Sequence, residues 1–231
     1  EARPRAHRQK PPLHRLVAIT GVSGSGKSTL VTKTLYPALA RVLDLEYLPV
    51  QEYKTIKGTD NIKSVLLIDQ SAIGKSARSS PITYLKAFDA IRNIMAAVPE
   101  SKFRGYTPGT FSLNVDGGRC PSCKGTGYEE IDMMFMDNVI IPCDVCDGKK
   151  YRNEILEVKY KDKNIFEILS MTVAEAMTFF VAHPNIRKPL SVLKEVGLDY
   201  LQLGQPAGTL SGGESQRMKI AKELSQIQQK S

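Results

Sequence analysis

A loop rich in glycine and serine near the amino terminus has the residue types that hold phosphate. It reads GVSGSGKS from Gly21 to Ser28 and fits the pattern G-x-x-x-x-G-K-[ST] in full. Glycines let backbone N–H groups turn toward phosphate oxygens, and the helix that follows presents its positive end to the same anion. Lys27 can reach the β- and γ-phosphates, and the Ser28 hydroxyl can ligate Mg²⁺. We therefore predict an ATP and Mg²⁺ site, the alternative being a glycine-serine turn that matches by chance. The residues expected to contact the nucleotide here are Gly21, Ser23, Gly24, Ser25, Gly26, Lys27, Ser28 and Thr29.

Four cysteines form a second group, with the spacing of metal ligands. Two residues separate Cys120 from Cys123, two separate Cys143 from Cys146, and 19 residues lie between the pairs. Four soft thiolates favour tetrahedral Zn²⁺ in a closed site that leaves no position for catalysis. Because such sets also hold iron–sulfur clusters, a cluster remains an alternative, as do buried free cysteines. We predict a structural zinc site made by these four thiolates.

A third segment, LSGGESQR from Leu210 to Arg217, combines two glycines with the start of a helix. Ser211 and Glu214 fit an ordinary capping box, which is the purely structural interpretation. The segment also closely resembles the signature motif of ABC ATPases, a family that carries the phosphate loop as well. The resemblance implies that this helix start faces the γ-phosphate bound to the other nucleotide-binding half. The signature residues expected to contact that nucleotide are Ser211, Gly212, Gly213 and Glu214.

Gln70 follows an apolar run, at the place where ABC ATPases carry the Q-loop glutamine. In the family this residue contacts Mg²⁺ or the attacking water, and only the resemblance gives Gln70 that role. The expected catalytic residues are therefore Lys27, Ser28 and Gln70.

Apolar periodicity indicates the elements that must position these groups. Short apolar runs at Leu16–Thr20 and Val65–Ile68 predict buried strands. A helix is expected from Ser28 to about Leu43, with a break or kink at Pro37. Apolar residues at helical spacing predict another helix over Thr83–Ala97.

The rest of the chain has its own signals. Tyr128–Ile141 contains β-forming residues around Asp137-Asn138, which predicts a hairpin between the two cysteine pairs. Three later helices are expected: one behind a capping box of Thr172 and Glu175, one over Pro189–Glu195 that stops at Gly197, and one from Ser211 to about Gln228.

Composition and charge narrow the class of protein. The chain has 231 residues, 42% of them hydrophobic, which is a globular rather than a disordered composition. No stretch reaches the apolar length that crosses a bilayer and no signal peptide opens the chain, so we expect a soluble, cytoplasmic protein without a membrane partner. The net charge of +8 suggests an anionic partner, although the basic arm over residues 1–15 supplies +4 of it.

Basic residues flank the cysteine turns and could meet the phosphates of an anionic partner. The alternative is that they are solubilising charges, offset by acidic residues nearby. The basic residues considered are Arg119, Lys124, Lys149 and Lys150.

A four-cysteine module between a phosphate loop and an ABC signature is an unusual combination, and it resembles the UvrA family of bacterial nucleotide excision repair. Further stretches extend the resemblance over almost all of residues 16–224, and they point to the second nucleotide-binding half of that family. The resemblance implies ATP-driven recognition of double-stranded damaged DNA, and we expect Arg119, Lys124, Lys149 and Lys150 to bind that DNA. It also implies three partners: the other ATPase half, a second copy in a homodimer and a UvrB-type helicase subunit. The stretches are Ile68–Arg92, Arg104–Gly127, Pro142–Tyr151 and Val196–Arg217.

The expected fold class is α/β, an incomplete ABC-type P-loop ATPase core with an inserted zinc-binding β-hairpin module and a helical signature region. We expect a basic irregular arm at residues 1–15, the first part of the core at 16–103, the zinc module at 104–152 and the signature region at 153–231. No run of four apolar residues followed by Asp-Glu occurs, so the Walker B carboxylates are missing and we expect little ATP hydrolysis by this chain alone.

Two other classes of protein stay open. A transport ATPase subunit generally lacks four inserted cysteines, and a zinc-stabilised binding module leaves the phosphate loop unexplained.

Overall fold

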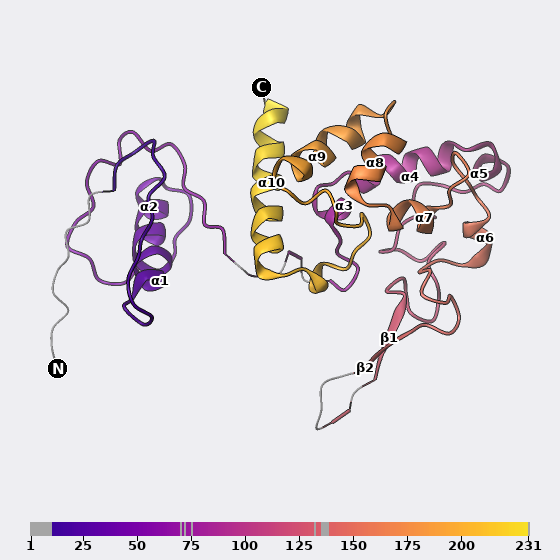
Figure 1. Ribbon diagram of the computed structural model, residues 1–231, viewed down its shortest axis with the longest axis horizontal. Coiled ribbons are helices and arrows are strands. Elements are labelled where there is room, and N and C mark those ends of the chain that lie inside the picture. The colour runs from indigo at the N-terminus through magenta and orange to yellow at the C-terminus, as the bar shows by residue number, and fades with distance from the viewer. Residues whose placement is uncertain are drawn as a thin grey trace. The chain divides into compact units, whose positions relative to one another are not determined.

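The computed structural model divides the chain into two compact units, Glu1–Leu67 and Ile68–Ser231 (Figure 1). It describes all residues except 1–10, 70, 72, 75, 132, 135–138 and 231, and it does not describe the side chains of residues 226–230. Most of the basic arm and all of Gln70 therefore lie outside the described residues.

One continuous helical segment dominates the described part of the first unit. At the break expected at Pro37, a π-helical stretch gives way to an α-helix. Proline has no N–H to donate to the carbonyl four residues earlier. That carbonyl, on Lys33, accepts instead from the backbone N–H of Gln51 at 3.0 Å. The expected helix is confirmed, and its parts are α1 (Lys27–Thr29), a π-helical stretch η1 (Leu30–Leu35) and α2 (Tyr36–Val42).

The two buried strands expected around the phosphate loop are not formed. Leu16–Thr20 and Val65–Ile68 are extended or irregular without strand pairing, and Leu16 is fully exposed. A strand needs a neighbour that takes its backbone hydrogen bonds, and the described residues of the first unit include no such neighbour. Both strand predictions are wrong, and the described residues contain no parallel sheet of an ATPase core.

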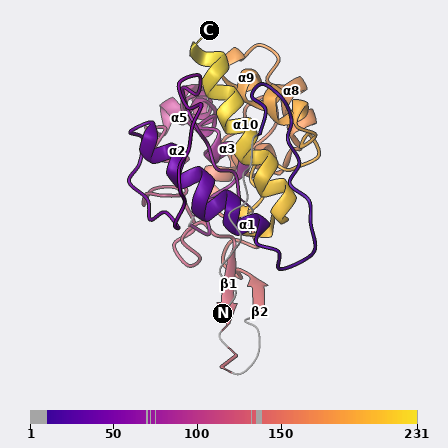
Figure 2. The same ribbon diagram turned by 90° about the vertical axis from the view of Figure 1, so that its left-hand side faces the viewer.

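Short helices around one apolar core form the second unit, and a two-stranded hairpin extends from them (Figure 1, Figure 2). Tyr151, Phe111 and Phe180 are among the largest side chains that are fully buried there. The Tyr151 hydroxyl donates to the Phe111 carbonyl oxygen at 2.9 Å, so the buried phenol is satisfied. None of the helices in the described part of the chain is both long and apolar enough to span a membrane. The helices are α3 (Pro81–Tyr84), α4 (Phe88–Ala97), α5 (Pro99–Phe103), α6 (Asn153–Leu156), α7 (Ile165–Ser170), α8 (Val173–Phe179), α9 (Pro184–Glu195), the 3-10 turn η2 (Ala207–Thr209) and α10 (Gly212–Lys230).

The hairpin consists of β1 (Tyr128–Ile131) and β2 (Val139–Pro142), which pair antiparallel. Tyr128 lies opposite Pro142, and Ile131 lies opposite Val139. This confirms a hairpin between the cysteine pairs, while the predicted turn at Asp137-Asn138 falls outside the described residues.

Capping signals in the second unit are confirmed. Thr172 Oγ1 accepts from the N–H of Glu175 at 3.2 Å, and Glu175 Oε2 accepts from the N–H of Thr172 at 2.8 Å, at the start of α8. Gly197, at φ +71°, follows the end of α9, as expected, although this helix begins earlier than predicted, at Pro184.

The helix expected over Thr83–Ala97 is instead divided into α3 and α4. Lys86 has a left-handed φ of +59°, and the N–H of Ala87 donates to the Ile82 carbonyl at 3.1 Å, which ends α3 in a Schellman-type turn. Leu85 and Phe88 are buried on either side of this turn. Apolar residues therefore keep helical spacing across the break, and their periodicity does not reveal it.

Candidate nucleotide and zinc sites

The phosphate loop leads directly into α1 with a backbone that suits glycine. Gly24 and Gly26 have left-handed φ angles of +77° and +85°. Gly26 is the N-cap, and its carbonyl accepts from the N–H of Leu30 at 2.8 Å. The first N–H groups of the helical segment are thus available at the loop, as an anion site requires.

Lys27 folds back over this loop. Its Nζ donates to the carbonyl oxygens of Gly21 at 2.8 Å and Val22 at 2.7 Å, and to Ser25 Oγ at 3.4 Å. These three contacts use all three donors of the ammonium group. The cation is therefore held by the loop that the sequence predicts to surround phosphate, while the Ser28 side chain is exposed beside it.

The signature segment forms the predicted capping box. Glu214 Oε2 accepts from the N–H of Ser211 at 2.7 Å and from its hydroxyl at 2.9 Å, and the N–H of Glu214 donates to Ser211 Oγ at 3.2 Å. Tyr200 donates to the other carboxylate oxygen at 2.5 Å. The hydrogen bond from Tyr200 has the largest effect in lowering the pKa of Glu214, and the hydrogen bonds from Ser211 lower it further. Glu214 thus shapes the helix start, while Gly212 and Gly213 remain exposed.

The four cysteine sulfurs come together in the second unit. All are buried, and all four Sγ atoms lie within 4.8 Å of one another. The distance from Cys120 Sγ to Cys143 Sγ is 3.9 Å, and that from Cys123 Sγ to Cys146 Sγ is 3.7 Å. Tetrahedral zinc with Zn–S bonds of about 2.3 Å separates its sulfurs by about 3.8 Å, whereas a disulfide needs about 2.05 Å. The donor set and its spacing fit zinc.

Each cysteine pair ends in the same backbone turn. Lys124 and Gly125 have φ angles of +52° and +87°, and Asp147 and Gly148 have +50° and +74°. This left-handed pair turns the chain back toward the sulfurs. The repeat seen in the sequence is therefore a repeat of structure.

Backbone hydrogen bonds join the two cysteine turns. The N–H of Cys120 donates to the Lys150 carbonyl at 2.9 Å, and that of Cys143 donates to the Gly127 carbonyl at 3.1 Å. The N–H of Gly127 also donates to Cys123 Sγ at 3.3 Å. The first two bonds hold the turns together, and the third stabilises the Cys123 thiolate that a metal requires.

The thiols differ in acidity. Burial raises the pKa of Cys120, and it raises that of Cys146 to about 12. Burial also acts on Cys143, but N–H groups of Cys146 and Val145 donate to its sulfur and lower its pKa to about 7. Without a metal the cluster therefore keeps protons at neutral pH, and a metal must displace them.

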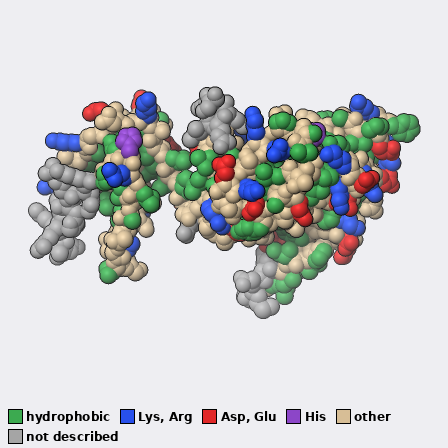
Figure 3. Space-filling view, turned by 45° about the horizontal axis from the view of Figure 1, so that its top comes forward, with side chains coloured by type: hydrophobic (Ala, Val, Ile, Leu, Met, Phe, Trp, Pro, Cys, Tyr) green, Lys and Arg blue, Asp and Glu red, His purple; other side chains and the backbone are tan. Residues whose placement is uncertain are grey.

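The four basic residues predicted to bind DNA lie in different surroundings. Arg119 is 12% exposed in its side chain and pairs with Asp116 at 2.7 Å. Lys150 turns inward, where its Nζ donates to the Gly204 carbonyl at 3.0 Å and burial lowers its pKa. Lys124 is exposed, and Lys149 is 44% exposed. Lys124 and Lys149 are thus the more exposed of the four, and Lys149 also pairs with Asp147 at 3.5 Å. Lys and Arg alternate with Asp and Glu over the face of this unit that Figure 3 shows.

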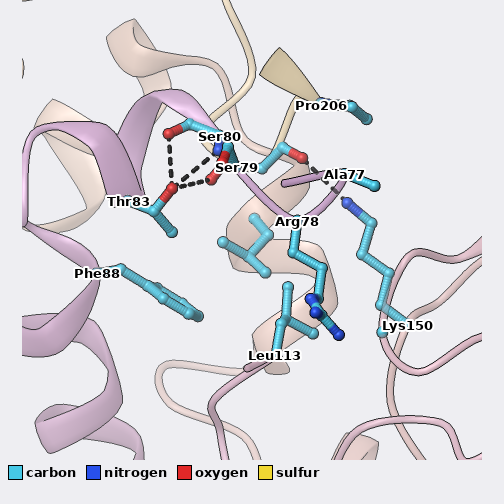
Figure 4. Close-up of a pocket in the computed structure, with 12 residues that line it drawn as sticks. Ala77, Arg78, Ser79, Ser80, Thr83, Phe88, Leu113, Lys150 and Pro206 are labelled. Carbon is cyan, nitrogen blue, oxygen red and sulfur yellow. Dashed lines mark hydrogen bonds between the residues drawn. The ribbon is translucent and has the colours of Figure 1, made fainter. Parts of the chain in front are cut away.

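Arg78 and Lys150 line one small pocket, where the zinc module contacts the loop before the signature (Figure 4). Arg78 Nη1 donates to the Lys124 carbonyl at 3.2 Å, 46 residues along the chain. The N–H of Ala207 donates to the Ser79 carbonyl at 2.8 Å in the same region. The sequence carried no signal for Arg78, because its partner is brought to it only by folding.

Comparison with known proteins gives the family. No family model matches the chain. The chain is 54% identical over 214 residues to the UvrABC system protein A of Aquifex aeolicus, which covers 93% of this chain and 23% of that protein. It is 51% identical over 215 residues to the UvrABC system protein A of Listeria monocytogenes, with 93% of this chain and 22% of that protein covered. UvrA2 from Deinococcus radiodurans matches in structure with a TM-score of 0.78 and 45% identity, over 89% of this chain and 24% of that one. The chain thus spans about a quarter of the length of these proteins. Over the segment that it spans, the chain belongs to the UvrA family.

Proposed function

We propose that this chain is the phosphate-loop, zinc and signature segment of the second ATPase half of a UvrA-type protein. In this proposal it binds ATP and serves ATP-driven recognition of damaged double-stranded DNA in nucleotide excision repair. The observation that carries the proposal is the combination of a phosphate loop holding Lys27 with four buried cysteines whose sulfurs lie within 4.8 Å of one another. The sequence identity of about half to UvrABC system protein A supports the same role.

Lys27 is the residue on which nucleotide binding depends. Its present acceptors are two neutral carbonyl oxygens and one hydroxyl. Phosphate oxygens carry negative charge and accept stronger hydrogen bonds than carbonyls do. The β- and γ-phosphates of ATP therefore replace these acceptors, and the exposed Ser28 hydroxyl takes the place of a Mg²⁺ ligand.

The start of α10 supplies a second nucleotide contact. Gly212 and Gly213 are exposed, and nothing lies within 4 Å of a methyl group built on Gly213. A phosphate can thus approach the free N–H groups of the first turn. Because Glu214 is occupied by Ser211 and Tyr200, we assign it the shaping of this turn rather than a nucleotide contact. The nucleotide met here belongs to the other ATPase half.

Zinc has a structural role in this proposal. Cys120, Cys123, Cys143 and Cys146 hold it, and no ligand position is left for a substrate. The ion supplies positive charge that keeps four buried thiolates together and so fixes the cysteine turns at the base of the hairpin. Lys124 and Lys149 project from these turns and are assigned DNA phosphate contacts, whereas Arg119 bonds within the module and Lys150 attaches it to the loop before the signature.

Two other functions fit less well. A transport ATPase subunit would account for the phosphate loop and signature but not for the four clustered sulfurs. A zinc-stabilised binding module would account for the sulfurs but not for Lys27 and its loop. A UvrA-type protein accounts for both, with the other ATPase half, a second copy of the protein and a UvrB-type helicase subunit as partners and the cytoplasm as location.

One titration tests the proposal. The purified chain, kept reduced and free of chelator, is analysed for zinc and titrated with a fluorescent ATP analogue and Mg²⁺. We expect about one zinc per chain and saturable binding that unlabelled ATP displaces. Absence of nucleotide binding from a chain that holds zinc would overturn the ATPase assignment and favour the zinc-stabilised binding module.

A further inference from the structure

Tyr200 lies in the loop between α9 and the 3-10 turn η2, and its hydroxyl reaches the signature helix α10. The hydroxyl donates to Glu214 Oε1 at 2.5 Å and accepts from Arg217 Nη2 at 3.5 Å. The other carboxylate oxygen, Oε2, accepts from the N–H and the hydroxyl of Ser211. Each oxygen of Glu214 thus has its own partner, one within the capping box of α10 and one outside that helix.

The loop that carries Tyr200 is fixed to another helix. The Asp199 carbonyl accepts from the N–H of Ala174 at 3.0 Å, and the Leu201 carbonyl accepts from that of Val173 at 2.9 Å. These N–H groups belong to the first turn of α8, where helical residues have no acceptor in their own helix. The two residues beside Tyr200 therefore cap α8 with their backbone, while the Tyr200 side chain contacts α10.

The contact between Tyr200 and Glu214 joins a neutral donor to a charged acceptor. Their hydrogen bond is the largest cause that lowers the pKa of Glu214, and it is also the largest cause that raises the pKa of Tyr200. At neutral pH the carboxylate is charged and the phenol keeps its proton, which makes the bond stronger than one between neutral groups. Because Tyr200 is 55% exposed, solvent screens the contact, and its effect is local rather than global.

A carboxylate in the first turn of a helix can also bind the free N–H groups at the helix start. Those groups of α10 lack acceptors in the helix and form its positive end, which attracts a negative side chain. If Glu214 left the capping box, it would compete there with phosphate. Tyr200 prevents this competition, because it holds Glu214 from a loop that is itself bonded to α8.

We propose that Tyr200 is a positioning residue for the signature turn. Its hydroxyl holds Glu214 in the capping box and so leaves the N–H groups of Gly212 and Gly213 open to an anion. Both glycines are exposed, and all of these residues belong to the second unit. The proposal deepens the proposed function and rests on it, since the signature turn meets nucleotide only in an ATPase. Tyr200 itself touches no nucleotide.

Amide exchange and carboxylate titration of the whole chain without ligand, both followed by NMR, test the contact. Tyr200→Phe keeps the ring and removes the hydroxyl. We expect the Glu214 amide to exchange about two- to tenfold faster, as for the loss of one hydrogen bond's free energy, and the pKa of Glu214 to rise toward its ordinary value. Tyr128→Phe is the matched control, because within the described residues Tyr128 makes its hydrogen bonds through its backbone rather than its hydroxyl.

The same titration gives the direction of the pH dependence. The pKa of Glu214 is lowered in the folded chain, so its contribution to the capping box is present above the ordinary pKa and is lost as pH falls through the lowered one. Tyr200→Phe should move this loss to higher pH. Equal exchange and an equal pKa of Glu214 in the parent and Tyr200→Phe would overturn the contact. If Tyr200→Phe does not fold, Glu214→Gln serves instead, and a pKa of Tyr200 that stays as high as in the parent would overturn the contact.

Inorganic pyrophosphate tests the positioning role. The amide resonances of Gly212 and Gly213 report on the signature turn, and those of the phosphate loop around Lys27 serve as an internal reference. We expect saturable shifts at both places in the parent and in Tyr128→Phe. Tyr200→Phe should bind pyrophosphate at least about threefold more weakly at the signature turn, as for the loss of one hydrogen bond, and equally well at the loop. A general loss of stability would not separate the two places.

Two results would count against the positioning role. Equal affinity of the parent and Tyr200→Phe for pyrophosphate at the signature turn would overturn it directly. A parent without shifts at Gly212 and Gly213 would refute the nucleotide contact proposed for this turn, and the positioning role with it. A parent without shifts at the phosphate loop would refute the proposed function instead, while exchange and titration still judge the contact between Tyr200 and Glu214.

Discussion

Gly127 is the position where a single methyl group should damage the zinc module most. Its φ is +85°, and a methyl group added there would lie 2.7 Å from the Gly148 carbonyl oxygen and 3.0 Å from Lys150 Cγ. A left-handed backbone costs an alanine about 1–2 kcal/mol, and forcing atoms into an occupied space adds about 1–3 kcal/mol. Because metal affinity and folding are linked, Gly127→Ala should lower zinc affinity by about 2–5 kcal/mol, or roughly 30-fold or more.

Gly148→Ala is the matched control for this substitution. Gly148 lies in the same module with φ +74°, but its nearest neighbour would be the Gly127 carbonyl oxygen at 3.8 Å, an ordinary contact. Only the backbone cost of about 1–2 kcal/mol applies, so its affinity should fall by roughly 5- to 30-fold. Competition with a chromophoric zinc chelator at constant pH measures both. Equal affinities for the two variants would refute the claim that close packing between the cysteine turns sets the site.

Three further predictions follow from the same geometry. Lys27→Ala should reduce the affinity for a fluorescent ATP analogue at least about 100-fold, because the phosphates lose their charged donor; unchanged binding would show that the loop is not a phosphate site. Zinc affinity should fall as pH is lowered from 8 to 6, by at least about tenfold per pH unit. Cys146, with its pKa raised to about 12, must release a proton before it can bind zinc, and below about pH 7 Cys143 must also release one. A chelator competition that is flat with pH would contradict this. Exchanging Lys124 and Lys149 for alanine together should weaken duplex DNA binding and lower its salt slope by about two, which fluorescence anisotropy at several salt concentrations checks.

Features set by neighbours in the chain could be predicted from the sequence. The boxes at Thr172 and Ser211 involve residues three apart, so their spelling is enough to predict their hydrogen bonds. The cysteine cluster was also predicted, because two tight turns and a shared metal leave few arrangements for four thiols. The left-handed turn at Lys86 was not predicted, because apolar residues continue at helical spacing on both sides of it.

Features that depend on distant partners could not be predicted. An apolar run such as Leu16–Thr20 has the composition of a strand, but composition does not supply a neighbouring strand. Lys150 donates a hydrogen bond to Gly204, which lies 54 positions away in the sequence. Lys219 donates to Asp69 and Ser71, which lie 150 and 148 positions away. No local pattern distinguishes these lysines from solvent-exposed ones such as Lys124.

The central claim, that nucleotide bound at Lys27 serves recognition of damaged DNA, is tested most directly by one linkage measurement. The affinity of the chain for a duplex with a single defined lesion and for the matched intact duplex is measured with and without ATP analogue and Mg²⁺. We predict that nucleotide changes the ratio of the two affinities by at least about fivefold, the lower end of typical coupling, and that Lys27→Ala abolishes this change. An equal ratio with and without nucleotide, in a chain that binds both nucleotide and DNA, would contradict the account.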